Sequence, residues 1–340
     1  MNDLSYPNRR NLFLEGVFLL TALIGSVLFC QLRLRLCDLF ADAEFFQQMA
    51  GHVGEKPWQY RILIPAMAGL LNHIKLPAED SLFAWAKILE ILFMFFTVIA
   101  FRHWLFLLLK DRKVASLLSF SLFAVLPFHH FFPRPYFANY WYDTPALLVL
   151  ILGIIFLYEK RWTAYYVLFL IGTFNRETTC FLTVIYLLTS FAREKTTTLA
   201  AHCGAQFVIW MVIKTMLGKI YLDNPGVNGF EWYVAPGVTH YADNIRHLMS
   251  PMNYPVLLGI MGFLWIPVLV FHKRIGNDFV KRSLWVFIPY FAGMFLVANF
   301  YELRIYAELI PLFLSAFLLI LIDLIKSPTQ AAPDLSRPGA

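Results

Sequence analysis

The segment QYRILIPAMAGLLNHI, residues 59–74, decides how this chain is laid out. A transmembrane helix needs about 20 consecutive, mainly apolar residues. This segment is apolar but shorter than that, and Pro65 and Asn72 interrupt it. Whether it crosses a bilayer sets the orientation of every loop that follows it.

The rest of the chain is dominated by longer apolar runs. Hydrophobic residues make up 59% of the 340 residues and charged residues only 15%, whereas soluble proteins carry about 25% charged residues. We therefore expect an all-α, polytopic membrane helix bundle over residues 1–325, and a cytoplasmic tail without fixed structure at 326–340. Two short apolar runs form a hairpin, at 162–174 and 178–191. The longer candidate crossings are 12–32, 82–109, 114–133, 141–158, 199–221, 254–272, 283–299 and 304–325.

Basic residues in the short loops decide whether segment 59–74 crosses. Lys and Arg are enriched in cytoplasmic loops of membrane proteins. All the basic loops of this chain can lie on that side only if segment 59–74 stays on the other side. We therefore expect it to form an interfacial helix. The basic residues concerned are Arg9, Arg10, Lys110, Arg112, Lys113, Lys160, Arg161, Arg193, Lys195, Lys273, Arg274, Lys281, Arg282 and Lys326.

The resulting topology has about ten crossings, with both termini in the cytoplasm. Interfacial helices occupy a first outer segment at 33–81, and a further outer loop covers 222–253. That loop mixes aromatic and polar residues, as carbohydrate sites and many interfacial loops do; they include Trp232, Tyr233, His240, Tyr241, Asp243 and Asn244. We expect a multi-pass protein of the bacterial inner membrane, in the cell envelope. The net charge of +6 is accounted for by the cytoplasmic loops, so the expected partners include membrane lipids but no nucleic acid.

Polar residues that could carry chemistry gather on the outer side. Asp42 stands just before an amphipathic stretch in the first outer segment. It could be a catalytic base or an acceptor-binding carboxylate, or it could simply cap a helix, as Asp often does. Asp38 and Glu44 are the alternative candidates for the base.

Two further acidic and basic positions follow. Asp143 precedes Pro145 at the outer mouth of the bundle, where it could act catalytically or cap the helix at 145–158. Asn175-Arg176-Glu177 lies between the two short runs of the hairpin. Charged residues inside a membrane are costly unless they are paired or functional, so this cluster predicts a site.

A late cluster, Glu302 and Arg304, begins the last crossing. Glu308 lies four residues after Arg304, so the two are expected to pair on one helical face. Alternatively, Arg304 is held by carboxylates and faces an anionic headgroup, because a planar guanidinium suits phosphate, and Arg61 and Arg246 could join it. Glu90 is expected to pair with Lys87 at i−3.

The first outer segment also carries two spaced motifs, D-x-x-x-aromatic-x-x-x-A and aromatic-R-x-L-x-P. The residues are Asp42, Phe46 and Ala50 in the first, and Tyr60, Arg61, Leu63 and Pro65 in the second. Their order resembles the glycosyltransferase C superfamily, the multi-spanning enzymes that include protein mannosyltransferases and aminoarabinose transferases. The resemblance covers roughly residues 10–190. The chain departs from it in having Asp-Ala-Glu instead of an adjacent acidic pair, and in lacking a soluble outer domain.

The resemblance implies transfer of a sugar from a polyprenyl-phosphate-linked donor to a glycan, lipid or protein acceptor at the outer face. Asp42 and Asp143 would then be catalytic. The residues expected to bind substrate are Arg61, Arg176, Glu177, Glu302 and Arg304. The carboxylates could bind Mg²⁺ or Mn²⁺, but their spacing demands no metal and assigns no ligand.

Two other classes of protein stay open. A polysaccharide polymerase or ligase would also use lipid-linked glycans and outer arginines. A lipid or solute transporter would place its charges near the midplane on discontinuous helices. Walker, H-E-x-x-H and G-x-S-x-G motifs do not occur in the sequence, so the chemistries that these motifs support have no basis here.

Overall fold

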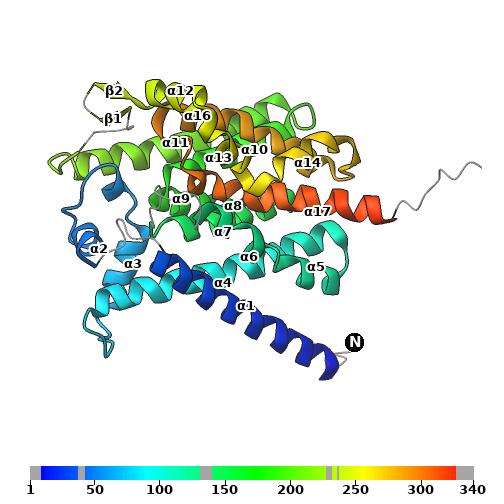
Figure 1. Cartoon of the computed structure of the whole chain (residues 1–340), viewed down its shortest axis with the longest axis horizontal. Helices are drawn as coiled ribbons and strands as arrows, with labels where there is room; N and C mark the ends of the chain where they lie inside the picture. Colours follow the sequence, from blue (N-terminus) through cyan, green and yellow to red (C-terminus); the bar gives the residue numbers. More distant parts are fainter. Residues whose placement is uncertain (1–8, 37–42, 131–139, 227–231, 236, 327–340) are drawn as a thin grey trace, which may run out of the picture.

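The computed structural model describes residues 9–36, 43–130, 140–226, 232–235 and 237–326, and this part of the chain is nearly all helical (Figure 1). Two short strands, β1 (Tyr233–Ala235) and β2 (Val238–Thr239), form an antiparallel hairpin. The expected all-α class is confirmed at this level. The predicted tail lies outside the described residues beyond Lys326.

The first outer segment contains short helices, as predicted. Residues 59–74 form α3 (Leu63–Leu71), whose nine residues span only about 14 Å at 1.5 Å per residue. Pro65 sits in the first turn of α3, where its missing N–H costs nothing. Ile64 and Ala68 bury the inner face of α3 beside Phe46 of α2. The other elements of this part are α1 (Arg9–Leu36), α2 (Ala43–Ala50) and α4 (Ser81–Leu109).

The middle of the chain forms a hairpin and one broken segment. The run 114–133 was expected as one crossing but is divided, because Ser119 and Ser121 donate their hydroxyls to backbone carbonyls three residues earlier and Pro127 has no N–H to donate. The helices are α5 (Arg112–Ser119), α6 (Leu122–Val125), α7 (Pro127–His130), α8 (Asp143–Tyr158), α9 (Trp162–Asn175), α10 (Phe181–Ser190) and α11 (Thr196–Ile220).

The last third is interrupted in the same way. The run 254–272 is broken at Met261, Gly262 and Phe263, whose φ angles are 55°, 61° and 64°, a left-handed conformation that cannot continue a right-handed helix. The break packs on α7. The helices are α12 (His240–Met249), α13 (Tyr254–Leu258), α14 (Trp265–Val270), α15 (Asp278–Ser283), α16 (Phe287–Val297) and α17 (Ile310–Lys326), with a 3₁₀ segment at Leu303–Leu309.

Within the described ranges, five helical stretches are long and apolar enough to cross a membrane. Apolar side chains on the outside of α1, such as Phe13 and Leu20, are 70% and 59% exposed, which is typical of a lipid-facing helix. Two shorter apolar helices, Asp143–Tyr158 and Glu177–Ser190, pack inside the bundle. The five stretches are Asn11–Leu36, Ser81–Leu109, Thr196–Ile220, Asp278–Val297 and Leu303–Lys326.

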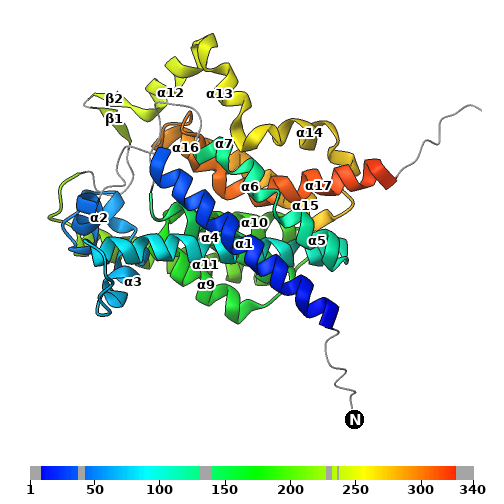
Figure 2. The same cartoon turned by 60° about the horizontal axis from the view of Figure 1, so that its bottom comes forward.

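The basic loops lie together at one end of the molecule. The start of α1, α5 and the last turn of α17 are found at this end, whereas α2, α3 and the strands lie at the opposite end (Figures 1 and 2). Ion pairs connect one loop to the next around the basic end. They join Glu15 to Arg102 and Arg112, His103 to Glu159, Lys160 to Glu194, Arg193 to Asp278, and Arg274 to Asp323.

Candidate functional site

Asp143 is the centre of a buried cluster of charges. It is the first residue of α8, where the helix dipole favours a negative charge, and it is 2% exposed. Its Oδ2 lies 3.3 Å from Arg33, and its Oδ1 lies 3.2 Å from Arg176 and 3.7 Å from Arg304. Its carboxylate therefore binds guanidinium groups and does not cap the helix.

Arg33 connects α1 to this cluster. Its side chain is fully buried, and its Nη1 donates to Glu90 of α4 at 2.6 Å and to Thr144 at 2.7 Å. Its Nη2 donates to the carbonyl of Tyr140 at 2.8 Å. Partners of this kind offset the cost of burying the charge, although Nε of Arg33 makes no hydrogen bond within the described residues. The expected pair of Glu90 with Lys87 is wrong, since the Lys87 ammonium lies over the Phe83 ring.

Arg176 and Arg304 take their partners from the 3₁₀ segment and the residue before it. Arg176 lies 2.6 Å from Glu308, which also accepts a hydrogen bond from Thr178. Arg304 donates to Glu302 at 2.7 Å. The expected pairing of Arg304 with Glu308 is wrong, because a 3₁₀ helix has three residues per turn and turns residues four apart away from each other.

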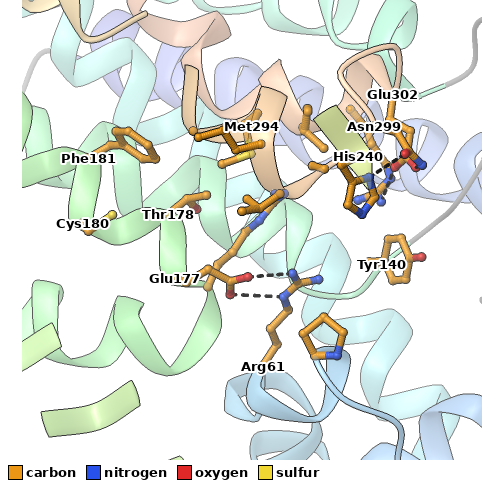
Figure 3. A pocket seen from close by; sticks show the side chains of 18 of the residues that line it. Arg61, Tyr140, Glu177, Thr178, Cys180, Phe181, His240, Met294, Asn299 and Glu302 are labelled. Atoms are coloured by element: carbon orange, nitrogen blue, oxygen red, sulfur yellow. Dashed lines mark hydrogen bonds and ion pairs between the residues drawn. The ribbon is translucent and has the colours of Figure 1, made fainter. Parts of the chain in front are cut away.

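Arg61 reaches the same region from the first outer segment. It donates to Glu177 at 2.9 Å and 3.4 Å, as Figure 3 shows. The guanidinium of Arg61 also lies 4.1 Å from the centre of the Tyr142 ring, and that of Arg304 lies 4.2 Å from the Tyr140 ring. Stacking on tyrosines holds both guanidinium planes in place.

These side chains form one end of a cavity of about 460 Å³. The opposite part of the wall is apolar and comes from α10 and α16 (Figure 3). The polar lining residues include Arg61, Arg176, Glu177, His240, Glu302 and Arg304, and the apolar ones include Phe181, Gly293, Met294, Leu296 and Val297.

Helix α12, whose first residue His240 lines the cavity, is held against α16 by hydrogen bonds. Asn244 donates to the carbonyls of Phe295 and Ala298 and accepts from the backbone N–H of Phe300. The Tyr301 hydroxyl donates to Asp243. These bonds tie α12 to the end of α16, so the cavity is preformed.

His240 begins α12 and faces this cavity. Its Nδ1 lies 2.9 Å from Oδ1 of Asn299, and Nδ2 of Asn299 donates to Glu302 at 2.8 Å. Burial lowers the pKa of His240 below its ordinary value of 6.5, although Asn299, Glu302 and Asp243 act in the opposite direction. The ring is therefore neutral at pH 7.

The structure brings together most of the residues that the sequence suggested. Arg61, Arg176, Glu177, Glu302 and Arg304 line the one cavity, and Asp143 lies directly beneath Arg176 and Arg304. Asp42 and Asp38 lie outside the described residues. Glu44 is exposed on α2 and is not part of the cavity wall.

Sequence reasoning missed Arg33, and it named Glu90 and Glu308 with other partners than those they have. It named His240 only as one polar residue of the loop 222–253. Arg33 and Glu90 lie within or beside long apolar runs, where a charge needs a partner, so their presence was a usable signal. The sequence could not show that they pair with each other, because the two residues are 57 positions apart.

Metal binding has no geometric support in the part of the chain that the structure describes. No group of three or more His, Cys, Asp or Glu side chains there is placed to hold a metal ion. Cys30, Cys180 and Cys203 are free thiols. The suggestion of Mg²⁺ or Mn²⁺ stays a prediction.

Comparison of the chain with protein-family models, with curated proteins and with solved structures finds no match.

Proposed function

We propose that this protein is a membrane glycosyltransferase of the glycosyltransferase C type. It moves a sugar from a polyprenyl-phosphate-linked donor to an acceptor at the outer face of the membrane. The observation that carries the proposal is the two-part cavity, with three arginines at one end and an apolar wall at the other. Such a cavity suits an anionic headgroup attached to a hydrocarbon chain.

The arginines have the right chemistry for the leaving group. When the bond between the sugar and the phosphate breaks, negative charge grows on the lipid phosphate, and fixed cations lower the barrier. Arg61 and Arg304 are paired with Glu177 and Glu302, whose side chains are 24% and 20% exposed. We expect the phosphate to bind the guanidinium groups beside these partly exposed carboxylates.

Asp143 acts from beneath the cavity in this proposal. It binds Arg176 and Arg304 and fixes where their guanidinium groups lie, so its role is to position them. Asp42, in the first outer segment, remains either the catalytic base or the carboxylate that binds the acceptor. The acceptor is a glycan, a lipid or a protein.

The proposal includes a topology of about ten crossings. The clustered ion pairs at the basic end support it, since cytoplasmic loops are rich in Lys and Arg. With that end in the cytoplasm of a bacterial inner membrane, both termini are cytoplasmic. The cavity and the segment 33–81 then face outward.

Binding of undecaprenyl phosphate to the purified protein in lipid nanodiscs tests the proposal. Arg304→Gln should weaken binding by about tenfold or more, because one charge-assisted contact contributes roughly 1.5–3 kcal/mol. The matched control is Arg274→Gln, which removes an exposed ion pair with Asp323 at the other end of the molecule.

Turnover is the second half of the test. Undecaprenyl-phosphate-linked hexoses and pentoses are incubated with the nanodiscs and a membrane extract, and released undecaprenyl phosphate is measured by mass spectrometry. Release that depends on Arg304 supports the proposal. If the wild-type protein does not bind undecaprenyl phosphate, or binds it equally after Arg304→Gln, the proposal is wrong.

A transporter is the second candidate, and one observation favours it. The left-handed break at Met261–Phe263 packs on the short helix α7, and discontinuous helices often line transport sites. Uptake or flipping of undecaprenyl phosphate by proteoliposomes, without release of sugar, would favour the transporter.

A further inference from the structure

A ring nitrogen of His240 has no partner among the described residues. The side chain is 4% exposed and forms part of the cavity wall. Its Nε2 is buried and makes no hydrogen bond there, whereas Nδ1 is held by Asn299. A buried polar atom without a partner is costly. A ligand that donates a hydrogen bond to Nε2 would remove this cost.

The neighbours of the ring determine which nitrogen carries the proton. An ionised carboxylate can only accept, and Glu302 accepts from Arg304. Asn299 must therefore turn its Nδ2 toward Glu302, which leaves its Oδ1 to face His240. Because that oxygen can only accept, Nδ1 of His240 carries the proton. In the neutral ring, Nε2 then keeps its lone pair.

The carboxylates of the same cavity are weaker candidates for a base. Glu177 is held by Arg61, and Glu302 is held by Arg304. A guanidinium next to a carboxylate stabilises its charged form and reduces its tendency to take a proton. Asp143 lies beneath the wall between three arginines. His240 therefore offers, among the described lining residues, a neutral basic nitrogen that no guanidinium holds and that makes no hydrogen bond.

We propose that His240 is the general base of the transfer reaction, an inference that rests on the proposed function. The acceptor hydroxyl oxygen forms a bond to the anomeric carbon, and its proton moves to Nε2 of His240. The bond from the anomeric carbon to the phosphate oxygen breaks, and its electron pair leaves with the polyprenyl phosphate beside Arg176 and Arg304. The imidazolium then returns its proton to water. Asp42 keeps the role of binding the acceptor.

The charges around the ring suit this task. Burial keeps the ring neutral before the reaction, as a base must be. Asp243 on the same helix and Glu302 on the facing turn stabilise the imidazolium once it forms. Arg304 is separated from the ring by Glu302 and Asn299, with which it forms a chain of hydrogen bonds.

The substitution His240→Asn separates the role of Nε2 as a base from the hydrogen bond that the side chain makes with Asn299. In His240→Asn the side-chain amide can still donate to Asn299, as Nδ1 does, but it has no group at the position of Nε2. We expect His240→Asn to bind undecaprenyl phosphate within about twofold of wild type, since the arginines are untouched. Its turnover, measured as undecaprenyl phosphate formed from the sugar-linked donor, should be roughly 10²–10⁴-fold slower. Asp42→Asn should mainly raise the acceptor KM.

The pH dependence gives a readout that a structural role would not move. The wild-type rate of sugar transfer, measured as undecaprenyl phosphate formed, should fall about tenfold per pH unit below the pKa of His240. The residual rate of His240→Asn should lack this fall. If His240→Asn binds undecaprenyl phosphate and transfers sugar at the wild-type rate, His240 is not the general base, and the proposed function stays intact. Loss of undecaprenyl phosphate binding in the wild type would refute the proposed function instead.

A measurement without a donor sugar completes the test. Diethyl pyrocarbonate acylates neutral imidazole nitrogens, and peptide mass spectrometry reports each histidine separately. We expect His240 to react and to be protected at least about fivefold by undecaprenyl phosphate, whereas exposed His73 is not protected. Failure of His240 to react after His73 is fully modified would overturn the proposal.

Discussion

At the scale of single residues, Asp143 holds three arginines together. Its carboxylate is shared by Arg33, Arg176 and Arg304, so Asp143→Asn removes one of the two carboxylates that each of these buried guanidinium groups faces. Removing one partner of a buried ion pair typically costs about 3–5 kcal/mol. We expect a clear drop in the unfolding temperature in detergent.

Asp323 provides the matched control for that substitution. Its pair with Arg274 is roughly half exposed on both sides, and exposed pairs contribute about 0–1 kcal/mol. Asp323→Asn should therefore leave the unfolding temperature almost unchanged. Equal effects of the two substitutions would show that the buried cluster does not stabilise the fold.

His240 should make stability depend on pH in a definite direction. Because its folded pKa is below the ordinary value of 6.5, the folded state binds fewer protons than the unfolded state, so stability rises with pH in this window. The contribution is complete above pH 6.5 and is lost as the pH falls below it. Between pH 7 and 5, the unfolding temperature of His240→Asn should fall less than that of wild type. Identical slopes would contradict this assignment.

Single residues also show where prediction from sequence stops. That Arg176 and Glu177 belong to a site was predictable, because unpaired charges in an apolar hairpin are costly. That Glu308 pairs with Arg176 was not, because periodicity assumes a regular helix and Leu303–Leu309 is 3₁₀. His240 stood in a loop whose aromatic and polar residues gave only a weak signal, since its role depends on Asn299, 59 residues away.

At the scale of elements, α16 supplies the apolar wall of the cavity. Gly293 lines it, and a Cβ there would lie 3.5 Å from the Phe181 ring, an ordinary contact. A larger side chain would fill the cavity without changing any charge. Gly293→Leu should weaken undecaprenyl phosphate binding about tenfold or more and leave the binding of inorganic phosphate unchanged.

The control for α16 is Gly204→Leu on α11, where an added Cβ meets nothing within 4 Å. Both substitutions replace a helical glycine by leucine, so their effects on helix propensity match. If Gly293→Leu binds undecaprenyl phosphate as wild type does, the hydrocarbon chain binds elsewhere, and the apolar wall is not part of the proposed site.

The helices also differ in how well the apolar pattern of the sequence predicted their ends and breaks. Long uniform runs, such as α1 and α4, were predicted within a few residues of their ends. The runs 114–133 and 254–272 look equally apolar, yet both are broken. Composition does not report backbone angles, and the break at Met261 and Phe263 puts non-glycine residues in the left-handed region, which only packing against α7 and its neighbours can stabilise.

At the scale of the whole molecule, the fold depends on segment 59–74. Charge alone predicted that it does not cross, and the nine-residue α3 agrees. This was predictable because the positive-inside rule acts on whole loops and needs no knowledge of contacts. The depth of the cavity was not predictable, since it arises from helices that are distant in the sequence.

Two cysteine substitutions test the topology directly in intact bacterial cells. In a background without native cysteines, His73→Cys places a thiol in the exposed turn after α3, and Gly276→Cys places one at the basic end, where an added Cβ meets nothing within 4 Å. A membrane-impermeant maleimide should label position 73 in intact cells, and position 276 only after lysis. If segment 59–74 crossed the membrane, every later loop would be inverted, so the turn at 73 would face the cytoplasm, the loop at 276 would face outward, and position 276 alone would be labelled before lysis. Labelling of position 276 alone would reverse the orientation and turn the cavity away from the outer face, which would remove the proposed acceptor from reach.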